Sequence, residues 1–343
     1  MSAEQPVNYQ PPAHRAFLRA IAAAEDEMSL QLAQGVMFEE EYVTTHLCSR
    51  LPPEVAYVKF AKKQESWVGG DYLWWWVDRT GEAFGCLVQA KVIRPKGRGW
   101  KIGFHHESRT GLQMDRLLAA AEFFEVMAAY TFYAGDAVYR SGMRCSLRHQ
   151  GVPCHERGGA GVTILPALIA QRAVENARLR ATAPPAKLPF LGGFDSIEDV
   201  FHHAEPLSRL TEPGLISDDP ALALYYRMRL GPEMNGLREL LTPGQAGARK
   251  VARFMTDKLA KAASATYETA VLPDVHTDLE ASGRVFGALP GTRGHFGRPF
   301  FEHALRGLRT GLPSYVQATL QNPADGVSAE LAEHADGLVV VYL

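Results

Sequence analysis

Three polar residues meet at the open end of a predicted β-hairpin. Asp71 precedes one apolar strand, and Gln89 and Lys91 lie at the end of the next. A three-residue loop in which Gly81 takes a positive φ closes such a hairpin, and it places Asp71 opposite Gln89. Because side chains alternate along a strand, all three polar side chains then share one face of the sheet. A one-residue slip at Gly81 would separate them.

The two strands are apolar on both faces, which predicts a central position in a sheet. Polar groups at the end of such strands need partners, because unpaired buried charge is costly. One alternative is a solvated sheet end at which Asp71 and Lys91 only form an ion pair. The other is chemistry, because carboxylate and amide oxygens bind Mg²⁺ and an ammonium group stabilises developing negative charge.

Two predicted helices each turn a polar side chain toward the apolar side. In FEEEYVTTHLCSRL the helical period places Glu40 in one stripe with Val43 and Leu47. Acids also suit a helix start, but that explanation does not distinguish Glu40 from the glutamates on either side of it. In the helix predicted over 111–127, Gln113 shares a face with Leu117, and helix capping is the alternative role for this amide.

The order of these motifs resembles the PD-(D/E)XK nuclease superfamily. The segments that carry the resemblance are EEYVTTHL, QESWVGGDYLWWW, LVQAK and GLQMDRL, which cover about a third of the chain. Gln89 stands where the family has an acid, as in the QXK variant of Mrr-type restriction endonucleases. The same set is similar to an uncharacterised bacterial restriction-endonuclease-like family, in whose pattern Glu65 is a second-tier candidate.

The resemblance implies an endonuclease that uses Mg²⁺ or Mn²⁺, acting on DNA more readily than RNA, in bacterial defence or DNA processing. Asp71 would be the central metal ligand, beside the side chain of Gln89 or the carbonyl of Ala90. Glu40 would bind the metal or orient water, and Lys91 would stabilise the transition state. Because Gln89 removes one negative charge, a catalytically inactive nucleic-acid-binding or interaction module remains the alternative.

A basic segment follows Lys91 and contains no acid. We expect it to form a loop that grips phosphates and stacks on a base, with a solvated loop as the alternative. Its candidate residues are Arg94, Lys96, Arg98, Trp100 and Lys101. A second basic run lies on the helix predicted over 246–263, where a solvated helix face is the favoured interpretation. Its members are Arg249, Lys250, Arg253, Lys258 and Lys261.

The predicted fold is α/β, with a restriction-endonuclease-like core of a central mixed sheet flanked by helices, and a mostly helical C-terminal region. The expected divisions are a disordered lead-in (1–15), the nuclease core (16–182), a Pro- and Gly-rich linker (183–195) and the helical region (196–343). That region would supply dimerisation or substrate choice, and its last strand could join the core sheet. The predicted elements are helices at 16–51, 111–127, 167–180, 196–204, 219–229, 246–263 and 298–310, and strands at 55–60, 72–78, 84–90, 128–134 and 161–165.

Composition and the absence of known motifs argue against several other classes of protein. The 343 residues carry 36 Lys and Arg against 38 Asp and Glu, a formal net charge of −2, which argues against binding nucleic acid by bulk charge. No apolar run reaches the roughly 18 residues of a membrane span. Four cysteines are too few for a disulfide scaffold, so we expect a cytoplasmic protein. No phosphate-binding loop, dinucleotide fingerprint or GxSxG motif is present.

Overall fold

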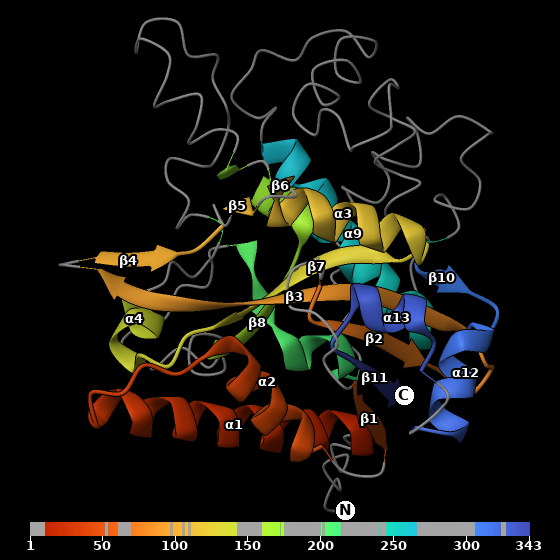
Figure 1. Ribbon diagram of the computed structural model, residues 1–343, viewed down its shortest axis with the longest axis horizontal. Coiled ribbons are helices and arrows are strands. Elements are labelled where there is room, and N and C mark those ends of the chain that lie inside the picture. The colour runs from red at the N-terminus through yellow and green to blue at the C-terminus, as the bar shows by residue number, and fades with distance from the viewer. Residues whose placement is uncertain are drawn as a thin grey trace, which may run out of the picture.

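The chain folds as a mixed α/β structure in which one large sheet has helices on both faces (Figure 1). The computed structural model describes residues 11–51, 54–60, 70–96, 99–104, 107–108, 111–142, 160–171, 173–174, 200, 203–213, 240, 245–265, 306–323 and 327–343. The mixed α/β class predicted from the sequence is confirmed at this level.

The sheet has seven strands along its main path. In spatial order they are β1 (Val55–Lys59), β11 (Gly337–Tyr342), β2 (Tyr72–Val77), β3 (Ala83–Lys96), β7 (Met127–Tyr133), β8 (Val162–Pro166) and β9 (Glu205–Pro206). Strand β11 is parallel to β2 and β7 is parallel to β3, whereas the other neighbours are antiparallel. Two short strands, β4 (Gly99–Ile102) and β10 (Leu308–Arg309), also pair with β3. A separate two-stranded sheet joins β5 (Glu107–Ser108) to β6 (Gly111–Leu112).

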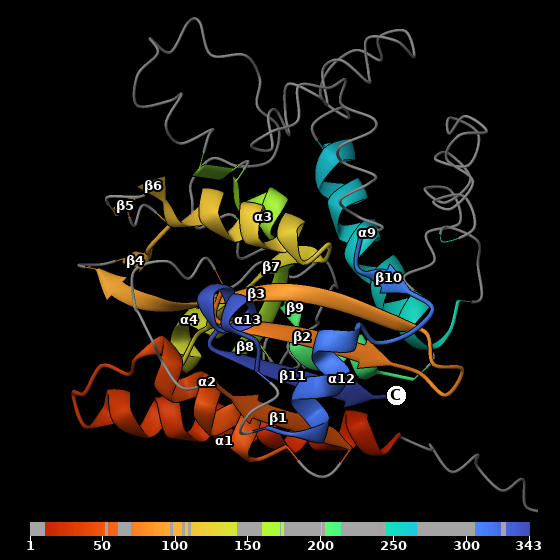
Figure 2. The same ribbon diagram turned by 45° about the vertical axis from the view of Figure 1, so that its right-hand side comes forward.

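Helices cover the two faces in pairs (Figures 1 and 2). One face carries α1 (Pro12–Ala33) and α2 (Glu40–Ser49), and the other carries α3 (Gln113–Phe123) and α9 (Gly247–Ala265). Further elements are α4 (Ala137–Gly142), the 3₁₀ helix η3 (Leu207–Thr211), α12 (Ser314–Gln321) and α13 (Ala329–His334), and residues 167–171 are also helical. Helix α1 buries an apolar stripe that includes Phe17, Ile21, Ala24 and Met28, the three-to-four-residue spacing of a helix packed on one side.

The hairpin register follows the prediction. Leu73 pairs with Leu87 and Trp76 pairs with Phe84, so the loop is centred on Thr80. Gly81 has a φ of 87°, the left-handed conformation that a three-residue loop requires of its last residue. All six residues of β2 are buried, as expected for strands covered on both faces.

The position of β11 corrects the expected order of strands. The family resemblance implies a three-stranded meander, which would place β1 next to β2. Instead β11 lies between them, with Val341 opposite Val55 on one side and Trp76 on the other. The first five residues of β11 are buried, and so apolar a strand is stable only where both edges and both faces are covered.

Several other helices and strands differ from the predicted ones in their bounds or type. The helix predicted at 16–51 is divided into α1 and α2, and α1 begins at Pro12, inside the predicted lead-in. The basic segment is not a loop throughout, because β3 continues to Lys96 and returns as β4. The helix predicted at 298–310 has β10 within its described part. The linker at 183–195 and the helix at 219–229 lie outside the described residues.

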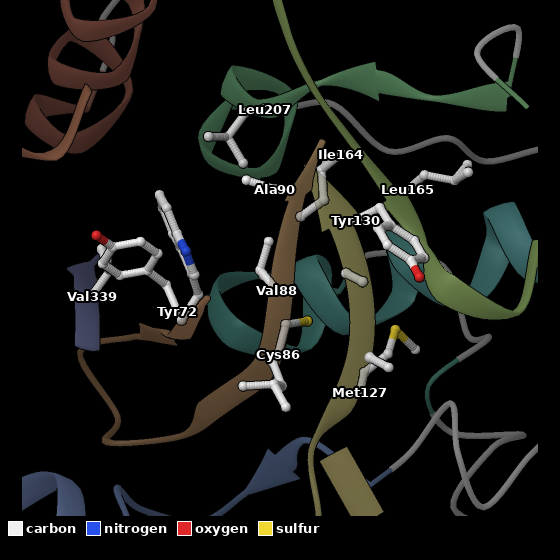
Figure 3. Packing of buried hydrophobic residues seen from close by; sticks show 14 of the residues in the cluster. Tyr72, Cys86, Val88, Ala90, Met127, Tyr130, Ile164, Leu165, Leu207 and Val339 are labelled. Atoms are coloured by element: carbon white, nitrogen blue, oxygen red, sulfur yellow. The ribbon is translucent and has the colours of Figure 1, made fainter. Parts of the chain in front are cut away.

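The core is rich in aromatic side chains. Trp75 and Trp76 are fully buried, and the rings of Trp74 and Trp76 lie 5.9 Å apart in a stacked arrangement. Figure 3 shows the small residues Cys86 and Ala90 along β3, among buried side chains that include Tyr72 and Tyr130. Large apolar rings contribute most of the burial free energy of such a sheet. Among the described helices, none has the length and apolar character needed to cross a membrane.

The packing around Gly85 gives a stability test. A Cβ atom at this position would lie 2.7 Å from the Trp75 ring and 2.8 Å from Val126. We expect Gly85→Ala to lower the free energy of unfolding by about 1–3 kcal/mol, because the core must shift to admit it. The control is Gly103→Ala, where a Cβ would meet nothing within 4 Å and the change should stay within about 0.5 kcal/mol. Urea denaturation measures both, and equal effects would contradict this account of the core.

Candidate functional site

Asp71 is fixed by the strands on both sides of it. Its backbone N–H donates to the Val88 carbonyl (2.8 Å), and its carbonyl accepts from the N–H of Asp336 (2.7 Å). The preceding residue is Gly70, and any larger residue would clash there, because a Cβ would lie 2.5 Å from the Leu87 side chain. The Gly-Asp sequence therefore allows the chain to approach β3 closely and deliver the carboxylate at the start of β2.

The Asp71 carboxylate binds the end of β3. One oxygen, Oδ2, accepts a hydrogen bond from the Ala90 N–H (2.6 Å), and Oδ1 accepts from the side-chain Nε2 of Gln89 (3.1 Å). Gln89 is 2% exposed, and its Oε1 is buried with no hydrogen-bond partner among the described atoms. The predicted juxtaposition of Asp71 and Gln89 is confirmed, and it leaves one unsatisfied buried oxygen beside the carboxylate.

Lys91 has a neutral partner. Its side chain is buried, and Nζ donates to Oε1 of Gln113 (2.7 Å), the first residue of α3. None of the ion pairs within the described part of the chain includes Lys91. The alternative of a simple Asp71–Lys91 ion pair is therefore not what the structure shows, and the predicted inward direction of Gln113 is confirmed.

Glu40 reaches β3 from the opposite face. It is the first residue of α2, and its Oε1 accepts from the Val92 N–H (3.2 Å). The flanking glutamates make exposed ion pairs instead, Glu39 with Arg94 (3.3 Å) and Glu41 with Lys59 (2.9 Å). Only Glu40 of the three turns toward the sheet end, as its place in the apolar stripe predicts.

The two carboxylates lie along one open edge of β3. Alternate residues of a strand direct their N–H and C=O groups to the same side, so Ala90 and Val92 face the same edge. Two residues of a strand span about 7 Å, which separates the backbone groups that Asp71 and Glu40 hold. The carbonyl of Ala90 faces this edge as well. Two carboxylates and a backbone carbonyl therefore lie along this edge beyond the end of β2, and the Gln89 amide donates to one of the carboxylates.

The environment of Asp71 disfavours its charged form. Burial raises the pKa of this carboxyl group to about 7, against the lowering effects of the Ala90 N–H and of the Lys91 charge. The negative charges of Glu40 and Asp336 raise that pKa further. Asp336 is a residue that sequence reasoning missed. Its signal was an Asp directly before the apolar run GLVVVYL, the same arrangement as Asp71 before YLWWW.

Aromatic rings form one wall of the site. Tyr130 pairs with Gln89 across β7 and β3, and the ring of Phe104 meets Tyr130 edge-on with centroids 5.2 Å apart. Burial raises the pKa of the Tyr130 hydroxyl, followed by the charges of Asp115 and Asp71. This wall excludes water from the Gln89 face of the sheet and strengthens the electrostatic interactions there.

The donor set fits a lightly charged cation site. Within the described ranges, no three His, Cys, Asp or Glu side chains lie close enough together to hold a metal ion. The oxygens at the edge of β3 come instead from two carboxylates and one carbonyl, and the Gln89 amide would add its oxygen after rotation of its terminal group. Mg²⁺ is commonly held by one or two carboxylates and completes its octahedral shell with water and substrate phosphate. The unpaired oxygen of Gln89 is the feature that favours an added cation.

The basic segment is described only in part. Arg94 and Lys101 are exposed and lie opposite each other in the β3–β4 hairpin. The backbones of Lys96 and Trp100 belong to the same hairpin, whereas their side chains and all of Arg98 lie outside the described residues.

The prediction for α9 is wrong where the structure describes it. Its basic residues do not form a solvated face, because they form ion pairs with other elements or within the helix. Arg249 pairs with Glu82 (2.8 Å), Lys258 pairs with Glu205, and the buried Arg253 pairs with Asp257 (3.7 Å). The side chain of Lys261 lies outside the described residues.

Comparison with known proteins gives a family and no activity. The model of a family of unknown function, DUF6615, matches residues 14–340, so the chain belongs to this family. No curated protein and no solved structure matches the chain.

The raised pKa of Asp71 predicts a pH-dependent stability. Between its ordinary value of 3.8 and about 7, this carboxyl group keeps its proton in the folded state and loses it in the unfolded state. The unfolded state then binds fewer protons, so stability falls as pH rises through this window. In EDTA, we expect the free energy of unfolding of the wild type to decline from pH 4 to 7 relative to Asp71→Asn. Asp26→Asn, on exposed α1 surface, is the control. A pH-independent difference between the wild type and Asp71→Asn would contradict the assignment.

Proposed function

We propose that this member of the DUF6615 family is a metal-dependent nuclease that hydrolyses phosphodiester bonds, with DNA preferred over RNA. The observation that carries the proposal is the open edge of β3, where Asp71 and Glu40 bind neighbouring backbone groups and the Lys91 amine lies buried. The proposal includes a restriction-endonuclease-like arrangement of β2, β3, α3 and β7, and a role in bacterial defence or DNA processing.

Asp71 and Glu40 would hold Mg²⁺ or Mn²⁺, together with the Gln89 side-chain oxygen or the Ala90 carbonyl. Such an ion polarises the phosphoryl oxygen and lowers the pKa of bound water. Gln89 now directs its Nε2 to Asp71 and leaves Oε1 unpaired. Rotation of the terminal amide would exchange these atoms and place a neutral oxygen ligand beside the carboxylate.

Lys91 would stabilise negative charge on the phosphate during hydrolysis. Its amine is held by the neutral amide of Gln113, so no carboxylate neutralises it directly. A cation fixed in a water-poor site stabilises a developing anion more strongly than one in bulk water. Gln113 would thus position the amine rather than contact the substrate.

Substrate binding is assigned to the β3–β4 hairpin, which continues from the same strand as Lys91. Arg94 and Lys101 are exposed there and would contact backbone phosphates. Lys96, Arg98 and Trp100 remain candidates in the same hairpin, the last for stacking on a base.

The second candidate function is an inactive nucleic-acid-binding or interaction module. Gln89 favours it, because an amide in place of a carboxylate lowers the negative charge available to hold a metal. The two functions share the fold and the basic hairpin and differ in metal binding and turnover.

Cleavage is the direct test. Plasmid DNA, single-stranded DNA and RNA are incubated with the protein and Mg²⁺ or Mn²⁺. We expect Asp71→Ala and Lys91→Ala each to reduce the cleavage rate at least 100-fold, since each removes a group that acts on the transition state. Arg19→Ala, an exposed position on α1, is the matched surface control. Equal cleavage by wild type, Asp71→Ala and Lys91→Ala would refute the site assignment.

Metal titration separates the two candidate functions. By calorimetry, we expect the wild type to bind Mn²⁺ at the Asp71 site and Asp71→Asn to lose this binding. Gln89→Glu, which restores an acid, should bind Mn²⁺ about tenfold more tightly because it adds a charged ligand. Intact nucleic-acid binding without any Mn²⁺ or Mg²⁺ binding would instead support the inactive module.

A further inference from the structure

A cavity lies at the other end of the central hairpin from Asp71. It has a volume of about 720 Å³ and opens beside the β2–β3 loop, η3, the start of α9 and the end of β11. The six residues of β2 separate it from Asp71 by about 20 Å. A volume of this size suits a small organic molecule.

The carboxylates that line this cavity are satisfied within the protein. Asp78 accepts hydrogen bonds from the N–H groups of Thr80 (2.9 Å) and Ala248 (3.1 Å). Glu82 pairs with Arg249 (2.8 Å), and Glu212 pairs with Arg209 (3.2 Å). None of the three needs a cation from a ligand.

Two cations at the cavity are not matched in this way. The amine of Lys250 donates to the backbone carbonyl of Glu212 and forms no ion pair within the described residues. Burial lowers the pKa of Lys250, and the charge of Glu212 partly opposes that effect. Arg79 is exposed in the hairpin loop and has no hydrogen bond or ion pair to another described residue. Both cations border the cavity, and neither is paired with a carboxylate among the described residues, so both are available to an anionic ligand.

The rest of the lining is largely apolar and well anchored. Pro11, Pro213 and Leu343 contribute from three separate segments. The wall formed by η3 is fixed to α1 because the buried His14 side chain lies 3.2 Å from the Thr211 hydroxyl. The cavity therefore joins an apolar surface to two cations on a preformed frame.

We propose that this cavity binds a small molecule that carries a carboxylate or phosphate group on an apolar body. The anionic group would contact Lys250 and Arg79, and the apolar body would cover the prolines and Leu343. Such a ligand site is independent of the nuclease proposed at the edge of β3, because the two sites share no residue.

The test is calorimetric titration of the full chain with octanoate for a carboxylate ligand and with AMP for a phosphate ligand. Octanol is the control probe that lacks the charge, and inorganic phosphate is the control probe that lacks the apolar body. We expect octanoate or AMP to bind saturably at one site, at least tenfold more tightly than octanol and phosphate respectively. Lys250→Met and Arg79→Ala should each weaken that binding about tenfold, whereas Arg19→Ala should not.

Arg79→Ala keeps the test decisive if Lys250→Met fails to fold, because Arg79 is exposed in a loop. Three results would overturn the proposal. The first is no saturable binding of either octanoate or AMP at millimolar concentration. The second is equal affinity for octanol and octanoate together with equal affinity for phosphate and AMP. The third is binding that neither folded variant weakens.

Discussion

The site depends on the fact that β3 is much longer than β2. Strand β3 has 14 residues and β2 has six, so the pairing with β2 ends at Val88 and leaves Ala90 and Val92 without a β2 partner on that edge. Buried backbone N–H groups must find acceptors. Asp71 and Glu40 supply them at Ala90 and Val92, and this need for acceptors brings two carboxylates to one edge. The polar centre is thus a consequence of how the sheet ends.

At the same edge, two electrostatic effects act on the charge of Asp71 in opposite directions. Hydrogen bonds from backbone N–H groups favour charged carboxylates, whereas burial and the neighbouring acids favour the protonated form of Asp71. The apolar core supplies stability that offsets the cost of this burial, since Trp75 and Trp76, further along β2, are fully buried. Strand β11 also contributes to the site through Asp336, the residue before it. The Asp336 N–H donates to the Asp71 carbonyl, and the Asp336 carboxylate adds negative charge. The site is therefore complete only when the C-terminal strand occupies its place in the sheet.

Local periodicity predicted most of what the site contains. The hairpin register, the positive φ of Gly81 and the inward directions of Glu40 and Gln113 all depend on contacts between near neighbours or on one helical face. The position of β11 and the role of Asp336 depend on pairing across more than 250 residues, for which a single sequence carries no register signal. The ion pairs of α9 were missed for the same reason, because Glu82 and Glu205 lie far from it in sequence. The family resemblance predicted a meander that this long-range insertion interrupts.

Gln89 explains how such a site can be both buried and lightly charged. A carboxylate there would be a further negative group beside Asp71, whose pKa the charges of Glu40 and Asp336 already raise. An amide avoids that repulsion and still offers an oxygen, at present unpaired. In the proposed nuclease, an amide at position 89 would make the affinity for the metal depend on the substrate. The substrate phosphate would supply the negative charge that a carboxylate at this position would have provided. Metal and nucleic acid would then bind together more tightly than either binds alone, a coupling that follows from charge balance at the edge of β3.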